Sequence, residues 1–127
     1  MKKVIFYIDE KVNGKVGSNK FYSGVHWAVR KKLADYWHEL VVVSMVEQKI
    51  PCMPFNKPVR VTLTVNSRLD IDNHGFLAKL IIDGLKGYLI EDDNRKFVQE
   101  LKICFYDEDM IKVEVEEIGG PYDKLYY

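Results

Sequence analysis

The chain has 127 residues and a mass of 14.9 kDa, so we expect residues 1–127 to form a single domain. Its 47% hydrophobic and 13% aromatic content excludes a disordered or collagen-like chain. The first apolar run ends at Asp9, too early for a secretory signal, and no later run approaches the ~18 apolar residues of a membrane span. We therefore expect a soluble, cytoplasmic protein with no membrane partner.

The net charge is zero, but charge is distributed unevenly along the chain. Residues 1–68 carry 12 Lys or Arg against 5 Asp or Glu, and residues 69–127 carry 7 against 14, so the two parts have formal charges of +7 and −7. This asymmetry suggests a polyanion-binding surface beside an acidic site. The alternative is that folding interleaves the two parts and their fields cancel.

The first half of the chain predicts a strand, a loop and a long helix. Residues 4–8 form a short β-branched and aromatic run typical of a strand, and residues 9–19 read as a loop. Apolar residues then recur at three- and four-residue steps from Val25 to Val41, which predicts a helix that runs to about Val43 or beyond. Ser23 is suited to its N-cap.

The rest of the chain predicts three more strands and a second helix. Residues 49–58 hold three of the four prolines and should be irregular. We expect a strand at 58–66, a helix at 73–86 that Gly87 ends, and strands at 97–106 and 110–118. The acidic turn between the last two strands predicts a hairpin. This order of elements indicates an α+β fold, a mixed β-sheet with two helices packed on it.

Two smaller features also carry expectations. Cys52 and Cys104 lie far apart and outside any Cys-x-x-Cys spacing, which favours free buried thiols over a disulfide. Gly84 falls inside the second predicted helix, where glycine costs about 1 kcal/mol relative to alanine. Its presence there indicates close packing or a dimer contact.

An acidic segment between residues 68 and 93 is the part of the sequence most suited to chemistry. Asp70 and Asp72 follow a predicted strand, and in an extended chain they would project to the same side, about 6–7 Å apart at Cα. Two carboxylates at this spacing suit a hard divalent cation. Asp92 and Asp93 follow the second helix, which we expect to return the chain toward the same strand end. The alternative is that these residues are solvated, or that helix N-termini attract them.

Lys79 and Asp83 are spaced to form an i, i+4 pair on the second helix. Such a pair is ordinarily a weak surface interaction. The functional alternative is a lysine directed at a phosphate and oriented by Asp83.

The order Leu-Asp-Ile-Asp-Asn at 69–73, Lys79, Asp83-Gly84-Leu85 and Glu91-Asp-Asp93 resembles the RusA family of Holliday junction resolvases, common in phages and prophages. Residues 18–27 are similar to the family's Asn-x-x-Tyr segment and the helix after it. The resemblance extends from about Asn19 to the last predicted strands. It departs from the family pattern at Lys79, which follows Asn73 at a longer spacing than in the best-known form.

The resemblance implies a RusA-like fold and a homodimeric, magnesium-dependent endodeoxyribonuclease that makes paired cuts in four-way DNA junctions. By position, Asp70, Asp72 and Asp93 would be catalytic and ligate Mg²⁺, Asp92 would be an auxiliary ligand, and Lys79 would act in catalysis or contact DNA. The metal would lower the pKa of a bound water and neutralise charge on the phosphate. Phosphate contacts would come from the basic part of the chain, with these DNA-binding residues: Lys11, Lys15, Lys20, Tyr22, Arg30, Lys31 and Lys32.

Other functions receive less support from the sequence. His26, His38 and His74 show no zinc spacing, although His74 could either approach the substrate or simply begin the helix. We expect no small-molecule substrate. Two alternatives stay open, a metal-dependent nuclease that acts on other branched DNA and a catalytically silent DNA-binding or assembly dimer.

Overall fold

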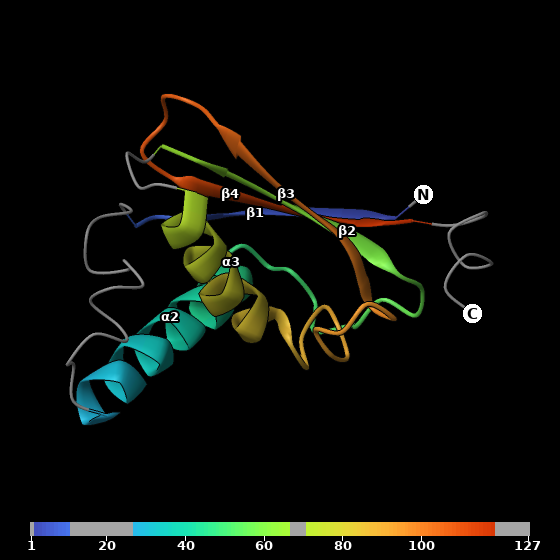
Figure 1. Ribbon diagram of the computed structural model, residues 1–127. Coiled ribbons are helices and arrows are strands. Elements are labelled where there is room, and N and C mark those ends of the chain that lie inside the picture. The colour runs from blue at the N-terminus through green and yellow to red at the C-terminus, as the bar shows by residue number, and fades with distance from the viewer. Residues whose placement is uncertain (1, 11–26, 67–70, 119–127) are drawn as a thin grey trace.

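The computed structural model describes residues 2–10, 27–66 and 71–118, with the backbone alone for residues 27–30 and 71–73. The elements in chain order are β1 (Lys3–Ile8), α2 (Trp27–Glu47), β2 (Val59–Val65), α3 (Ile71–Leu85), β3 (Val98–Phe105) and β4 (Ile111–Glu117). The strands form one sheet in the order β1-β4-β2-β3, in which only β2 and β3 are parallel neighbours. Both helices lie on the same face of this sheet (Figure 1). The expected α+β fold with a mixed sheet and two packed helices is confirmed.

The core lies between the sheet and the helices. Alternate residues of β2 point toward the helices and are at most 1% exposed, as the period-two pattern of that strand predicts. The helices contribute apolar side chains to the same cluster, and these include Trp37, Val41 and Met45 from α2 with Leu77, Ile81 and Leu85 from α3.

The two helices pack closely at Gly84. A Cβ atom at this position would lie 2.7 Å from Cβ of Val41 and 2.9 Å from its Cγ1. Real Cβ atoms do not approach other side chains this closely, so only glycine fits against Val41. The expectation of close packing at Gly84 is confirmed.

A residue with positive φ follows shortly after the end of each helix. Lys49 follows α2 with φ 61°, its N–H donates to the carbonyl of Val46 and the N–H of Ile50 donates to the carbonyl of Met45. This is the Schellman arrangement, with lysine where glycine is usual. Gly87, with φ 78°, follows α3 as the sequence predicts.

The predicted hairpin between the last two strands is wrong, because β2 lies between β3 and β4. The connection passes the end of β2, where the N–H of Tyr106 donates to the carbonyl of Val65. The alternate residues of β4 that face the helices are at most 1% exposed, so β4 belongs at the centre of the sheet. A five-residue connection can span the two strand spacings, about 10 Å, and the acidic turn therefore does not fix the pairing.

Other local expectations have mixed outcomes. Both thiols are free, but Cys52 is exposed and Cys104 only partly buried, so the expectation of buried thiols is wrong. Cys52 lies in the proline-containing segment outside the helices and strands, where no layer covers it. Most of the predicted 9–19 loop and the predicted N-cap Ser23 lie outside the described residues. No helix in the described part of the chain combines the length and apolarity needed to cross a membrane.

Candidate metal and nucleic-acid site

A chain of ion pairs runs along the exposed side of α3 and continues beyond its end. Nζ of Lys79 lies 3.5 Å from a carboxylate oxygen of Asp83, which confirms the predicted i, i+4 pair. The ammonium of Lys86 lies 3.7 Å from the other oxygen of Asp83 and 3.6 Å from Asp93. Lys79 is 60% exposed, so its charge is accessible to a ligand. The arrangement links three of the residues that the sequence singles out, Lys79, Asp83 and Asp93.

The sequence reasoning missed Lys86, which joins Asp83 to Asp93. The i, i+3 spacing of Asp83 and Lys86 in the sequence predicts the ion pair between them. The contact with Asp93 depends on how the loop after α3 turns, and no local pattern in the sequence specifies that turn.

Asp92 and Asp93 lie together in the loop that leads to β3. The backbone N–H of Asp93 donates to a carboxylate oxygen of Asp92 at 2.8 Å. Partial desolvation raises the pKa of the Asp93 carboxyl, but hydrogen bonding with Asp92 and the positive charge of Lys86 outweigh it and lower that pKa below its ordinary value. Asp93 is therefore a carboxylate at neutral pH, the form that a hard cation binds.

Asp72 lies at the opposite end of α3 from this loop. It is the second residue of the helix, and Lys86 comes directly after the last, so about 21 Å of helical rise separates their Cα atoms. If the side chain of Lys86 pointed straight back along the helix, it and its 3.6 Å contact with Asp93 would span only about half of the distance to Asp72. One cation with oxygen ligands at about 2–2.6 Å cannot join Asp72 and Asp93 of a single chain. The expectation that the helix returns the chain to the strand end it left is therefore wrong.

The predicted donor set suits Mg²⁺, but the described residues do not group it at one point. Carboxylate oxygens are the ligands this ion takes from proteins, and Asp92 and Asp93 supply an exposed pair of them. Among the described residues, which exclude Asp70 and the side chain of Asp72, no three His, Cys, Asp or Glu residues are grouped closely enough to hold a metal ion.

His74 is part of the core and not an exposed group beside the carboxylates. It is only 3% exposed, and its ring packs edge-on against Phe105 with centroids 5.1 Å apart. This contact fixes the first turn of α3 over the end of β3. Of the two alternatives for His74, the structure favours the ordinary residue of a helix start.

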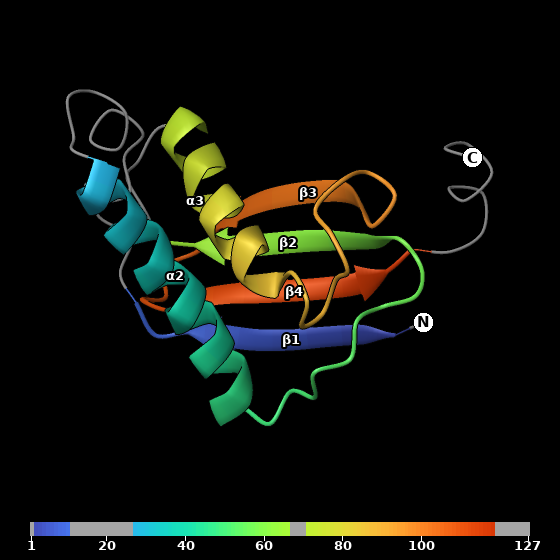
Figure 2. The ribbon, with the colours of Figure 1, turned by 90° about the horizontal axis from the view of Figure 1, so that it is seen from below.

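The predicted DNA-binding residues are described only in part. Lys11, Lys15, Lys20 and Tyr22 lie outside the described residues, and Arg30 is described by its backbone alone. Lys31 and Lys32 are exposed near the start of α2, where Lys31 pairs with Asp35 at 3.1 Å. Figure 2 shows that α2 and α3 begin at the same end of the sheet. The cationic start of α2 and Asp72 therefore share one end of the molecule.

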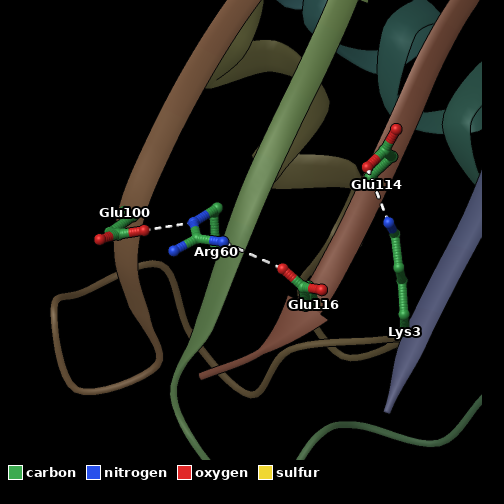
Figure 3. A network of polar contacts seen from close by, with 5 residues as sticks. All are labelled: Lys3, Arg60, Glu100, Glu114 and Glu116. Atoms are coloured by element: carbon green, nitrogen blue, oxygen red, sulfur yellow. Dashed lines mark hydrogen bonds and ion pairs between the residues drawn. The ribbon is translucent and has the colours of Figure 1, made fainter. Parts of the chain in front are cut away.

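On the sheet face opposite the helices, the basic and acidic parts of the chain do interleave. Arg60 contacts both Glu100 and Glu116, and Lys3 lies 3.4 Å from Glu114 (Figure 3). The hydrogen bond from Lys112, assisted by the one from Lys3, outweighs desolvation and lowers the pKa of Glu114 below its ordinary value. The charges that the described residues place on this face largely cancel, so these residues form no broad cationic surface for a polyanion.

Comparisons with known proteins leave the family unassigned. No protein-family model and no curated protein matches the chain.

Proposed function

We propose that this protein is a magnesium-dependent endodeoxyribonuclease that resolves four-way DNA junctions by paired phosphodiester hydrolysis. The observation that carries the proposal is the chain of ion pairs from Lys79 through Asp83 and Lys86 to Asp93. It holds an ionised carboxylate and exposed ammonium groups along one helix. Three of its members, Lys79, Asp83 and Asp93, coincide with positions of the RusA-like pattern, and that pattern carries the assignment to four-way junctions.

Each group has a definite part in this proposal. Asp70, Asp72 and Asp93, with Asp92 as auxiliary, would hold Mg²⁺, which when bound lowers the pKa of water and offsets charge on the phosphate. Lys79 would contact a phosphate oxygen of the DNA, because its ammonium is exposed. Asp83, which lies one helical turn further along α3, orients that ammonium. The exposed lysines at the start of α2 would contact the DNA backbone.

The geometry of α3 supports a site that two copies of the chain share. Because Asp72 and Asp93 of one chain lie too far apart to share a cation, we infer that Asp72 of one copy and Asp93 of the other form each metal site. A two-fold dimer then contains two equivalent sites, which is what paired cuts in a junction require.

Cleavage assays with purified protein test the activity. We expect cutting of a four-way junction in Mg²⁺, no cutting in EDTA, and no cutting of a linear duplex of the same sequence. Preferential cutting of flaps or forks would instead identify a nuclease for other branched DNA. Tight junction binding with no cutting in Mg²⁺ would identify the silent DNA-binding dimer.

Mixing two inactive variants tests the shared site. Asp72→Asn and Asp93→Asn should each abolish cleavage. In a site built from two copies, a heterodimer of these variants has one intact site and one doubly altered site. Random mixing should then restore nicking to about a quarter of the wild-type sites, since half of the dimers are mixed and each has one of two sites intact. A mixture as inactive as either variant alone would show that each chain builds its own site.

A further inference from the structure

Among the described residues, the two edges of the sheet differ, because a side chain bonds the backbone of one edge near its end. At the β1 edge, the side-chain amide of Gln48 takes the place of a neighbouring strand. Its Oε1 accepts from the N–H of Tyr7 at 2.8 Å, and its Nε2 donates to the carbonyl of Tyr7 at 2.6 Å. A contact of this kind hinders another chain from pairing with this end of β1.

The β3 edge has no such cover from the described residues. The N–H of Tyr106 donates to β2, and successive residues of a strand direct these groups to opposite sides. The backbone groups of Leu101, Ile103 and Phe105 therefore point away from the sheet. The side chains of Leu101 and Phe105 are 45% and 60% exposed, unusual for apolar residues on the helix-facing side.

We propose that β3 pairs antiparallel with β3 of a second copy, about a two-fold axis at Leu101. Residues facing each other across this pair have numbers that add to 202, so Glu100 faces Lys102 of the second copy and Lys102 faces its Glu100. Leu101 faces Leu101 on the side of the helices. In a non-hydrogen-bonded antiparallel pair the facing side chains are at their closest, and opposite charges there stabilise the pairing.

The alternation of charge on β3 suits this register. On the face opposite the helices, Arg60 contacts both Glu100 of β3 and Glu116 of β4 (Figure 3). Lys102 is exposed and forms no ion pair with a described residue. A second copy brought into the proposed register places its Glu100 opposite this lysine.

The same axis brings the separated acidic groups toward each other, and this consequence rests on the proposed function. The carbonyl of Asn94 accepts the N–H groups of Phe97 and Val98, so Asp93 borders the start of β3. The contact of His74 with Phe105 places the first turn of α3 over the end of β3. Antiparallel pairing sets the start of one β3 beside the end of the other. Asp93 of one copy and Asp72 of the other then lie at the same end of the paired strands.

Charge reversal tests the interface without DNA or metal. Sedimentation equilibrium of the full chain should show a dimer at micromolar concentration. Lys102→Glu and Glu100→Lys each place like charges opposite one another twice, and each should weaken dimerisation about tenfold or more. The control Lys57→Glu changes an exposed lysine outside the strands and should leave the dimer intact. Circular dichroism verifies that each variant is folded.

An equimolar mixture of the two β3 variants provides the decisive result. In a mixed pair every glutamate again faces a lysine, so native mass spectrometry should show heterodimers in excess of either homodimer. A monomeric wild type, a Lys102→Glu variant as dimeric as Lys57→Glu, or a mixture without heterodimers would each overturn the interface. A dimer that responds to charge reversal but cuts no DNA would keep the interface and remove the proposed nuclease function.

Discussion

Replacing Gly84 by alanine should destabilise the protein, although the same change ordinarily stabilises a helix. The new Cβ would lie 2.7, 2.9 and 3.1 Å from Cβ, Cγ1 and Cγ2 of Val41. Cβ of Val41 is attached directly to the backbone, and a β-branched side chain in a helix has one strongly preferred rotamer. The contact cannot be relieved by rotation, so α2 and α3 must move apart.

The expected magnitude follows from two opposing contributions. Alanine gains about 1 kcal/mol over glycine in a helix interior. Overpacking a well-filled core costs about 1–3 kcal/mol, and two contacts below 3.0 Å against a rigid side chain place this site near the upper limit. The net loss in the free energy of unfolding should be about 1–2 kcal/mol, which lowers Tm by about 4–8 °C.

Urea denaturation followed by circular dichroism measures this change, and the same helix offers a matched control. A Cβ at Gly75 meets nothing within 4 Å, so Gly75→Ala should stabilise the protein by about 1 kcal/mol. In a Val41→Ala background, Gly84→Ala should cost much less than in the wild type. If Gly84→Ala stabilises the protein as much as Gly75→Ala, the close packing of α2 on α3 is refuted.

Three further predictions follow from individual residues. Asp72→Asn should abolish junction cleavage yet bind the junction as tightly as the wild type or more tightly, since a carboxylate that repels phosphate is lost. The control Asp107→Asn should cut normally. Impaired junction binding or impaired folding of Asp72→Asn would contradict the metal role of Asp72. Lys49→Gly should raise the free energy of unfolding by about 1 kcal/mol, because lysine has φ 61° there; an unchanged urea midpoint would count against the strain. The pKa of Glu114 in the folded protein lies below its ordinary value of 4.5, so at acidic pH the folded state binds fewer protons than the unfolded state. The ionised Glu114 therefore stabilises the fold, and this contribution is lost as the pH falls from 4.5 through the lowered pKa. Glu114→Gln should show a shallower loss of stability in acid titrations, and an identical pH dependence would exclude this contribution.

Local patterns in the sequence identify each element but not the neighbours of each strand. The glycine after α3 and the alternation in β2 specify those elements well, because one or two residues determine the conformation. The position of β4 between β1 and β2 is different. This position depends on which strand buries its apolar side chains beneath the two helices. The acidic turn that precedes β4 does not specify which strand that is.

The candidate site shows the same limit. The Lys79 and Asp83 pair follows from helical spacing and is present. The convergence of Asp72 with Asp93 fails because α3 runs back along the parallel strands and ends far from its own start. Sequence order brings residues to the same helix, but only topology decides at which end of the sheet they lie.

The most direct test of the proposed function uses a supercoiled plasmid that extrudes a four-way junction. In Mg²⁺ the wild-type protein should convert this plasmid to a linear product with little nicked intermediate, because two sites related by a two-fold axis cut opposite strands within one binding event. A plasmid without the junction should stay supercoiled. An intact junction plasmid at saturating protein, or equal cutting of both plasmids, would contradict the assignment to junction resolution.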